Sequence, residues 1–318
     1  NGERDDPMTH YETDRRRTTF ARLEGAVRTF VRRIGVFLAL IKFEHTIFAL
    51  PFAYLGMLLA TRQGWPTWPQ FLWITVAMAS ARTVAMGANR IIDHMIDAMN
   101  PRTAGRPLAS GRVRPTTAWV GTAVSVFILA LAAWRLGTLP LILLPGAVVF
   151  LIGYSYTKRI TWLSHLVLGF TDGLAPMGAW AAVRGSLFTR ADGPAWLLLG
   201  IVTTWIGGFD LIYACQDVDF DREHGLHSVP ARFGVRTALW SSILSHVVTL
   251  ALLTWLGVSI PLGWPYWVGM IVVSVLLAYE HSLVKPHDLS RINVAFFNVN
   301  GYISVTLFLA VLAALHVP

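Results

Sequence analysis

Long apolar runs separated by short polar loops dominate the chain from residue 35 to residue 316. A helix needs about 20 mostly apolar residues to cross the hydrocarbon core of a bilayer. The pattern predicts nine membrane-spanning helices, at residues 35–60, 68–91, 116–136, 138–156, 161–183, 195–216, 237–258, 261–279 and 292–316. Proline and glycine occur within several of these runs, as membrane helices tolerate.

The composition supports the same fold class. Hydrophobic residues make up 54% of the chain and charged residues only 14%, whereas a soluble domain is about one quarter charged. The net charge of +8 does not indicate a nucleic-acid-binding protein, because the basic residues fall in short loops between apolar runs. The single cysteine, Cys215, excludes an intrachain disulfide. We therefore expect an all-α, polytopic protein whose surroundings are membrane lipid.

The polar and basic segments predict the domains and the orientation. Residues 1–34 form a polar N-terminal segment, which we expect to be partly disordered or an amphipathic helix on the membrane surface. Residues 35–318 form the transmembrane domain. Arginine and lysine gather in the loops at 98–115, 156–160, 217–236 and 280–291, all on one side. Basic loops stay in the cytoplasm, so we expect a multi-pass protein of the inner (plasma) membrane with its N-terminus and these loops inside.

Two clusters of oxygen-bearing side chains end the second and sixth apolar runs, on the predicted cytoplasmic side. Asn89, Asp93 and Asp97 recur every four residues, and so do Asp217 and Asp221. This spacing places each set on one face of a helix. Carboxylates are costly close to lipid, so two such sets indicate a function. Oxygen ligands of this kind suit Mg²⁺, which prefers carboxylates together with substrate phosphates.

Two points about these acids remain open from the sequence. Asp219 is two residues from both Asp217 and Asp221, about 200° around a helix. It joins the metal site only where the helix unwinds, and we keep it as an additional candidate ligand. The alternative to a metal site is that the aspartates form structural ion pairs with nearby arginines.

Basic and aromatic side chains suited to a phosphorylated substrate surround the acids. Arg106 lies in the basic loop after the first cluster, and Lys158 follows Tyr154 by four residues at the end of the fourth run. Arg82 and Lys42 lie in or next to apolar runs, where a cation indicates a substrate or a carboxylate partner. For Lys42, extension to the membrane surface or pairing with a neighbouring glutamate explains the residue equally well.

At these residues the chain resembles the UbiA superfamily of intramembrane aromatic prenyltransferases, in its 4-hydroxybenzoate polyprenyltransferase-like branch. The resemblance covers residues 35–316. The stretch from Tyr154 to Arg159 is similar to a third element of the family. The family's two motifs, Asn-x-x-x-Asp-x-x-x-Asp and Tyr-Ala followed by Asp-x-x-x-Asp, are matched here by Asn89, Asp93, Asp97, Tyr213, Asp217 and Asp221.

The resemblance implies a bundle of nine helices and a Mg²⁺-dependent transfer of a polyprenyl group from polyprenyl diphosphate to an aromatic acceptor. The acceptor would be 4-hydroxybenzoate or a related hydroxy-aryl or naphthoate acid, in ubiquinone or menaquinone biosynthesis. The implied metal ligands are Asn89, Asp93, Asp97, Asp217 and Asp221. The implied catalytic residues are Asp93, Asp97, Asp217, Asp221, Tyr154 and Lys158. The implied substrate-binding residues are Asn89, Arg82, Arg106, Lys42 and Tyr213.

Two alternatives stay open at this point. Intramembrane acids also occur in secondary transporters, although transporter sites usually lie at the membrane midplane rather than at helix ends. A family member with another acceptor, haem or a chlorophyll precursor, would keep the same acids. A CDP-alcohol phosphotransferase fits poorly, because its aspartates stand in one continuous run and these are split between distant helices.

Overall fold

The computed structural model describes residues 35–36, 39–41, 44–61 and 64–317, and almost all of them are helical. The predicted N-terminal segment 1–34 and Lys42 lie outside the described residues. The long helices are α2 (Glu44–Thr61), α3 (Trp68–Ile92), α5 (Pro115–Leu136), α6 (Thr138–Thr157), α7 (Ser164–Arg184), α8 (Gly193–Ala214), α11 (Val235–Ser259), α12 (Trp264–Ser282) and α13 (Asn300–Ala314). The short helices are α4 (His94–Met99), α9 (Val218–Glu223) and α10 (Val229–Phe233). The short turns are η1 (Arg190–Asp192), η2 (Cys215–Asp217) and η3 (Val294–Val299).

Seven helical segments of the described chain are long and apolar enough to cross a membrane. They confirm the prediction of an all-helical, multi-pass membrane protein, but not the count of nine spans. In helix α2 the apolar stretch found in the described part of the chain, Leu50–Thr61, is shorter than these seven. Helix α12 is not among the seven. It begins with Trp-Pro-Tyr-Trp and ends with Tyr-Glu-His-Ser, and these less hydrophobic ends lower its mean hydropathy.

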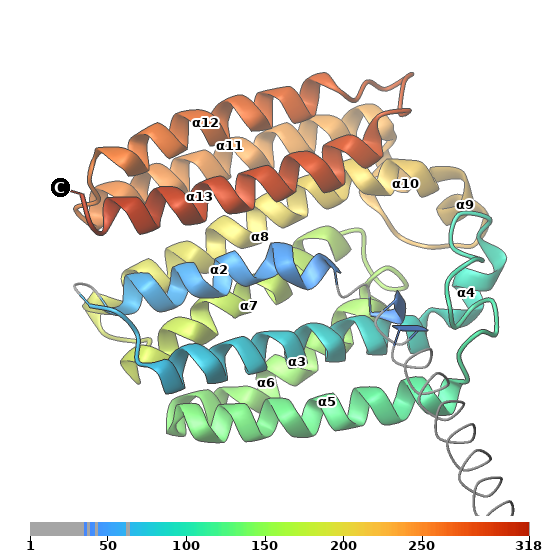
Figure 1. Cartoon of the computed structure of the whole chain (residues 1–318). Helices are drawn as coiled ribbons and strands as arrows, with labels where there is room; N and C mark the ends of the chain where they lie inside the picture. Colours follow the sequence, from blue (N-terminus) through green and yellow to red (C-terminus); the bar gives the residue numbers. More distant parts are fainter. Residues whose placement is uncertain (1–34, 37–38, 42–43, 62–63, 318) are drawn as a thin grey trace, which may run out of the picture.

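The long helices form a bundle with α7 and α8 near its centre (Figure 1). Helix α7 packs against α8 and α2, and α8 packs in turn against α11. Helices α11, α12 and α13 lie together on one side of the bundle, and α3, α5 and α6 lie on the other (Figure 1). Gly56 allows α2 to approach α7 closely, because a Cβ atom there would lie 2.1 Å from the carbonyl oxygen of Pro176.

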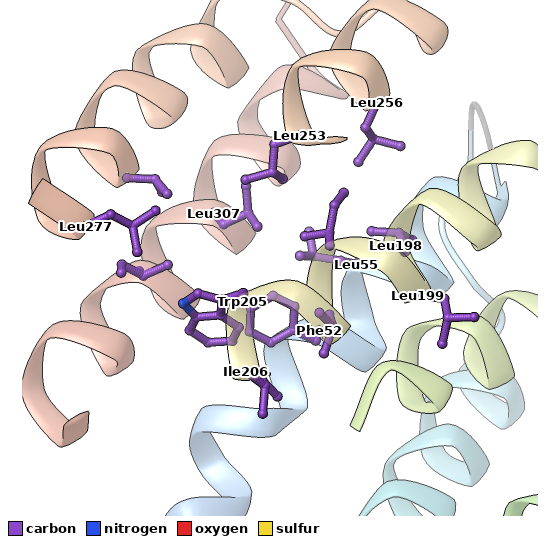
Figure 2. Close-up of a cluster of buried hydrophobic side chains, with 14 of the residues drawn as sticks. Phe52, Leu55, Leu198, Leu199, Trp205, Ile206, Leu253, Leu256, Leu277 and Leu307 are labelled. Atoms are coloured by element: carbon purple, nitrogen blue, oxygen red, sulfur yellow. The ribbon is translucent and has the colours of Figure 1, made fainter. Parts of the chain in front are cut away.

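A cluster of buried apolar side chains joins α2, α8, α11, α12 and α13. It includes Phe52, Leu55, Trp205, Leu253 and Leu307 (Figure 2). Lipid tails are as apolar as these side chains, so the cluster stabilises the bundle mainly through close packing rather than through removal from water. The cluster fixes the helices whose ends carry the functional side chains.

Both acidic clusters lie at one end of the bundle, where the helices are interrupted. Helix α3 ends at Ile92, Asp93 has φ −96° and ψ 5°, and α4 follows directly. Helix α8 continues through the short turn η2 into α9. Figure 1 shows α4, α9 and α10 together at this end and the C-terminus at the other.

Candidate active site

A cavity of about 350 Å³ opens among the helix ends that carry the acids. Its lining includes all five predicted metal ligands, namely Asn89, Asp93, Asp97, Asp217 and Asp221. Asn89 lies on α3, Asp93 at the break between α3 and α4, and Asp97 on α4. Asp217 lies in η2 and Asp221 on α9. Two clusters far apart in the sequence therefore face the same space. We call this space the main cavity.

Each of the four aspartates is paired with a basic side chain. The nitrogen–oxygen pairs are Arg159 with Asp93 (2.8 Å), Arg106 with Asp97 (2.6 Å), Arg102 with Asp217, and Lys158 with Asp221 (3.7 Å). Arg90 is a fifth cation, 3.8 Å from Asp97. Because the carboxylates turn toward these partners, no group of three or more His, Cys, Asp or Glu residues within the described ranges is arranged to hold a metal ion.

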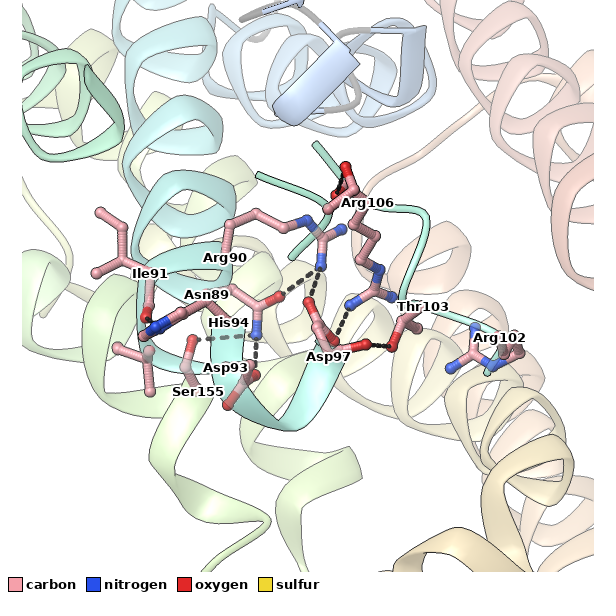
Figure 3. Close-up of polar contacts among 12 residues, drawn as sticks. Asn89, Arg90, Ile91, Asp93, His94, Asp97, Arg102, Thr103, Arg106 and Ser155 are labelled. Carbon is pink, nitrogen blue, oxygen red and sulfur yellow. Dashed lines mark hydrogen bonds and ion pairs between the residues drawn. The ribbon is translucent and has the colours of Figure 1, made fainter. Parts of the chain in front are cut away.

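Hydrogen bonds fix the first acidic cluster across the break between α3 and α4 (Figure 3). The Asn89 side-chain amide donates to the Asp93 carboxylate at 2.8 Å, and the Arg90 guanidinium donates to the Asn89 carbonyl oxygen at 3.1 Å. Backbone bonds from Asp93 N–H to Asn89 and from Asp97 N–H to Asp93 preserve the four-residue spacing. Burial raises the pKa of the Asp93 carboxyl to about 6, although the Arg159 guanidinium beside it acts in the opposite direction.

The second cluster is held by the loop that follows the first. The Arg102 guanidinium donates to both carboxylate oxygens of Asp217 and also to the Tyr213 hydroxyl at 2.8 Å. The Asp221 carboxylate is almost completely buried and accepts a hydrogen bond from Ser228 at 2.8 Å. Asp219 is exposed and is absent from the described lining of the main cavity. The helical phase predicted for Asp219 agrees with this placement.

Tyr154 and Lys158 both line the main cavity but point to different walls. Helix α6 ends at Thr157, so Lys158 lies past its last helical residue. The Tyr154 hydroxyl donates to the Ala85 carbonyl of α3 at 3.3 Å, whereas the Lys158 ammonium faces Asp221. A four-residue spacing would place both side chains on one face of a continuous helix, but α6 ends between them.

Arg82 lies deeper in the main cavity than the acids. It is 11 residues before Asp93 on α3, about 16 Å along the helix axis at 1.5 Å per residue. Its guanidinium is 3.5 Å from the Asp172 carboxylate of α7, and its buried Nε has no hydrogen-bond partner among the described residues. Arg82 therefore has an ion-pair partner and one donor left for another group.

The sequence interpretation missed a second pair in the main cavity, close to the second acidic cluster. The Asp210 carboxylate of α8 lines the main cavity, and its Oδ2 is 2.7 Å from Nδ1 of the buried His165. The Val229 N–H donates to Nε2 of His165, so the proton of the neutral ring lies on Nδ1 and is donated to Asp210. Lone carboxylates within apolar runs, at Asp172 and Asp210, were the signal that could have identified these residues.

One wall of the main cavity is aromatic. Phe296 stacks on Tyr213 with ring centroids 4.1 Å apart, and the edge of Phe209 meets Phe296 at 5.1 Å. Phe52 and Trp205 extend this wall toward the core. The main cavity thus combines a strongly charged end with an apolar wall, as a ligand with an anionic head and a hydrocarbon chain requires.

Comparison with known proteins agrees with the geometry. The model of the UbiA prenyltransferase family matches residues 49–312. A 4-hydroxybenzoate octaprenyltransferase of Cupriavidus necator is 32% identical over 243 residues, which cover 74% of this chain and 81% of that protein. The apo structure of a UbiA homolog from Aeropyrum pernix superposes with a TM-score of 0.77 and 33% identity, over 85% of this chain and 98% of that one. A UbiA homolog from Archaeoglobus fulgidus bound to DMAPP and Mg²⁺ shares the fold, with a TM-score of 0.66 and 17% identity over 89% and 99% of the two chains.

Proposed function

Because the chain belongs to the UbiA prenyltransferase family, and is thus a prenyltransferase with a multi-pass membrane fold, we propose that it transfers a polyprenyl group from polyprenyl diphosphate to a hydroxylated aromatic acid. The observation that carries this proposal is the main cavity, where two acidic clusters and five cations stand at one end and an aromatic wall leads away from them. The transporter alternative lacks such support.

The charges of the main cavity fit a bound divalent cation. At the charged end, five cationic side chains face four carboxylates, which leaves one excess positive charge there. A diphosphate carries more negative charge than this excess can balance, so a further cation is needed. All candidate donors are oxygens, and Mg²⁺ typically takes one or two carboxylates together with substrate phosphates. We propose that Asn89, Asp93, Asp97, Asp217 and Asp221 hold Mg²⁺, the ion bound with DMAPP in the Archaeoglobus fulgidus homolog.

The basic side chains then bind the diphosphate. Arg102, Arg106 and Lys158 are already at the charged end of the main cavity, and they neutralise the charge that develops as the allylic carbon–oxygen bond breaks. Bound Mg²⁺ would supply further charge neutralisation on the same oxygens. The bonding electron pair leaves with the diphosphate, and the π faces of Tyr154 and Tyr213 stabilise the resulting allylic cation.

The pairs Arg82–Asp172 and His165–Asp210 serve the aromatic acceptor. Arg82 binds its carboxylate through the guanidinium fork, and the ring attacks C1 of the allylic cation to form the new carbon–carbon bond. Asp210, oriented by His165, accepts the proton that the ring carbon loses. Since the main cavity, at about 350 Å³, is small for a ligand site, a single aromatic ring fits better than haem or a chlorophyll precursor.

The acceptor that the relatives' names support is 4-hydroxybenzoate, which would place the reaction in ubiquinone biosynthesis. A naphthoate acceptor of the menaquinone route is the second candidate, because it carries the same carboxylate beside a phenol. We further propose that the charged end of the bundle faces the cytoplasm at the inner membrane, because its loops carry most of the arginine and lysine.

A transfer assay in detergent tests the proposal. Purified protein is given Mg²⁺, prenyl diphosphates of increasing length and either 4-hydroxybenzoate or a dihydroxynaphthoate, and the prenylated product and released diphosphate are measured. Asp93→Asn and Asp217→Asn should each reduce the rate about 100-fold, and chelation should abolish it. Asp219→Asn is the matched control, because this exposed carboxylate lies on the same short helix as Asp221. Product formation that survives chelation would refute a metal-dependent transfer, and failure with every acceptor would refute the transferase.

A further inference from the structure

A buried polar cluster lies behind the aromatic wall of the main cavity, on helices that carry none of the acidic motifs. His246 of α11 contacts His281 of α12, with Nδ1 and Nε2 2.9 Å apart. Glu280, fully buried on α12, accepts a hydrogen bond from the Asn300 side-chain amide at 2.9 Å. We call Glu280 and Asn300 the α12–α13 pair. Asn300 also lines the main cavity, so the cluster reaches the site.

The α12–α13 pair adjoins an irregular turn. Residues Val294–Val299 form a π-helix directly before α13, and π-helical turns are rare and often occur at functional sites. The Asn300 backbone N–H bonds the Phe297 carbonyl rather than that of Phe296, its α-helical partner. The Asn300 side-chain amide instead donates to the carbonyls of Ala295 (3.1 Å) and Phe296 (3.3 Å). One amide therefore bonds both the turn and α12.

The π-helical turn determines where Phe296 lies. Its ring stacks on Tyr213, whose hydroxyl is bonded to Arg102, and Arg102 in turn holds Asp217. A continuous series of contacts thus runs from the α12–α13 pair to the charged end of the main cavity. Relaxation of the turn to a regular α-helix would change the direction in which Phe296 points.

The α12–α13 pair is costly for stability alone. Oε2 of Glu280 and Oδ1 of Asn300 are buried and have no hydrogen-bond partner among the described residues. Nδ1 of His246 lies 3.9 Å from Oε2, which is too far for a hydrogen bond. Unpaired buried polar atoms destabilise a fold, and two aliphatic side chains would pack here without that cost. These polar groups do what aliphatic side chains could not: the Asn300 amide bonds the π-helical turn and α12 at the same time. This bonding explains why the pair is present despite its cost in stability.

We propose that Glu280 and Asn300 are positioning residues: they hold the π-helical turn and so fix Phe296 against Tyr213, where its ring contacts the first isoprene units of the prenyl diphosphate. That a prenyl diphosphate is the ligand in contact with Phe296 rests on the proposed function. The allylic end of the substrate is the part that needs a fixed aromatic face, because the positive charge develops there.

Binding measurements on the full-length protein in detergent test this role. The dissociation constants of geranyl diphosphate with Mg²⁺, and of 4-hydroxybenzoate, are measured by calorimetry for the wild type, Asn300→Leu, Phe296→Ala and the double variant. Phe296→Ala should weaken geranyl diphosphate binding about tenfold. Asn300→Leu should do the same. The double variant should bind geranyl diphosphate no more weakly than Phe296→Ala, because both changes remove the same contact, that of the Phe296 ring with the ligand. The Kd of 4-hydroxybenzoate should stay within twofold.

Two further variants separate positioning from general loss of stability. Glu280→Gln keeps the acceptor for the Asn300 amide and should bind geranyl diphosphate like the wild type. Tyr302→Leu, on the exposed face of α13, should also be neutral. Where Asn300→Leu does not fold, Asn300→Ala removes the amide without adding charge or bulk and should show the same selective loss. Additive effects in the double variant, or equal losses for both ligands, would overturn the inference while the transferase stands. A wild-type protein that binds no prenyl diphosphate would overturn both.

Discussion

Replacing Arg82 by leucine removes two interactions at once, and the structure allows them to be separated. The guanidinium lies 3.5 Å from Asp172, and both side chains are about four-fifths buried. We propose that the same guanidinium also binds the carboxylate of the acceptor. The single variant Arg82→Leu therefore leaves Asp172 without its cation and the acceptor without its partner. The double variant Arg82→Leu/Asp172→Leu removes both buried charges and only then isolates the loss of the acceptor site.

The two losses have different expected sizes. Removing one partner of a buried ion pair lowers the free energy of unfolding by about 3 kcal/mol or more. We expect a loss at the lower end of this range here, because both side chains are partly exposed. Replacing both partners by apolar side chains is close to neutral for stability. Hydrogen bonds to a charged group contribute about 1.5–3 kcal/mol to binding, so the KM of the acceptor should rise about 10- to 150-fold in both variants.

Steady-state kinetics with 4-hydroxybenzoate and thermal unfolding in detergent distinguish these effects. We expect the acceptor KM to rise equally in the single and double variants, with the KM of the prenyl diphosphate unchanged in both. The midpoint of thermal unfolding should fall only in the single variant. An acceptor KM that returns to the wild-type value in the double variant would show that Arg82 acts only as the structural partner of Asp172.

Three further changes test other parts of the molecule. Lys158→Ala should raise the KM of the prenyl diphosphate about tenfold and leave that of the acceptor unchanged, because the ammonium lies at the charged end of the main cavity; a selective loss of acceptor affinity would contradict this. Asp210→Asn should lower kcat at least about 100-fold without changing the unfolding midpoint, since an amide cannot accept the ring proton; unchanged turnover would exclude it as the base. Gly56→Ala should reduce the yield of folded protein, because its Cβ would meet the Pro176 carbonyl at 2.1 Å, whereas Gly178→Ala has open space and should be neutral in the same expression and unfolding assay.

The fold could be predicted in large part because lipid leaves few options for an apolar chain. Apolar runs of sufficient length had to become helices, and those predicted at 68–91 and 138–156 differ from α3 and α6 by one residue at one end. The breaks at Asp93 and at η2 were not predictable from periodicity, because the four-residue spacing of side chains persists through them. The turn at η3 was not predicted either: the Asn300 amide that bonds it also donates to Glu280, 20 residues away in the sequence.

The candidate site was predicted by residue type better than by arrangement. Asp97 and Asp217 line one cavity, as two sets of costly carboxylates suggested. Their ion pairs with Arg106 and Arg102 depend on how the loop after α4 folds back, which spacing alone does not define. The sequence offered metal ligation and ion pairing as alternatives, and in the structure each aspartate has a cationic partner. His165 and Asp210 were missed, since they lie 45 residues apart in the sequence.

The ion pairs have a consequence for how the proposed ligands bind. Buried carboxylates and guanidinium groups without partners would be strongly destabilising, and in this structure each provides the other's counterion. Mg²⁺ alone would have to displace arginines that then lack partners, and a diphosphate alone would meet carboxylates that repel it. If both bound together, the arginines could pair with the phosphate groups and the carboxylates with the metal, so that no charge would be left without a partner. We therefore expect Mg²⁺ to tighten the binding of geranyl diphosphate, and geranyl diphosphate to tighten that of Mg²⁺, by the same factor. Titrations of each ligand at fixed concentrations of the other measure this factor, and a value of one would mean that the ion pairs persist when substrate binds.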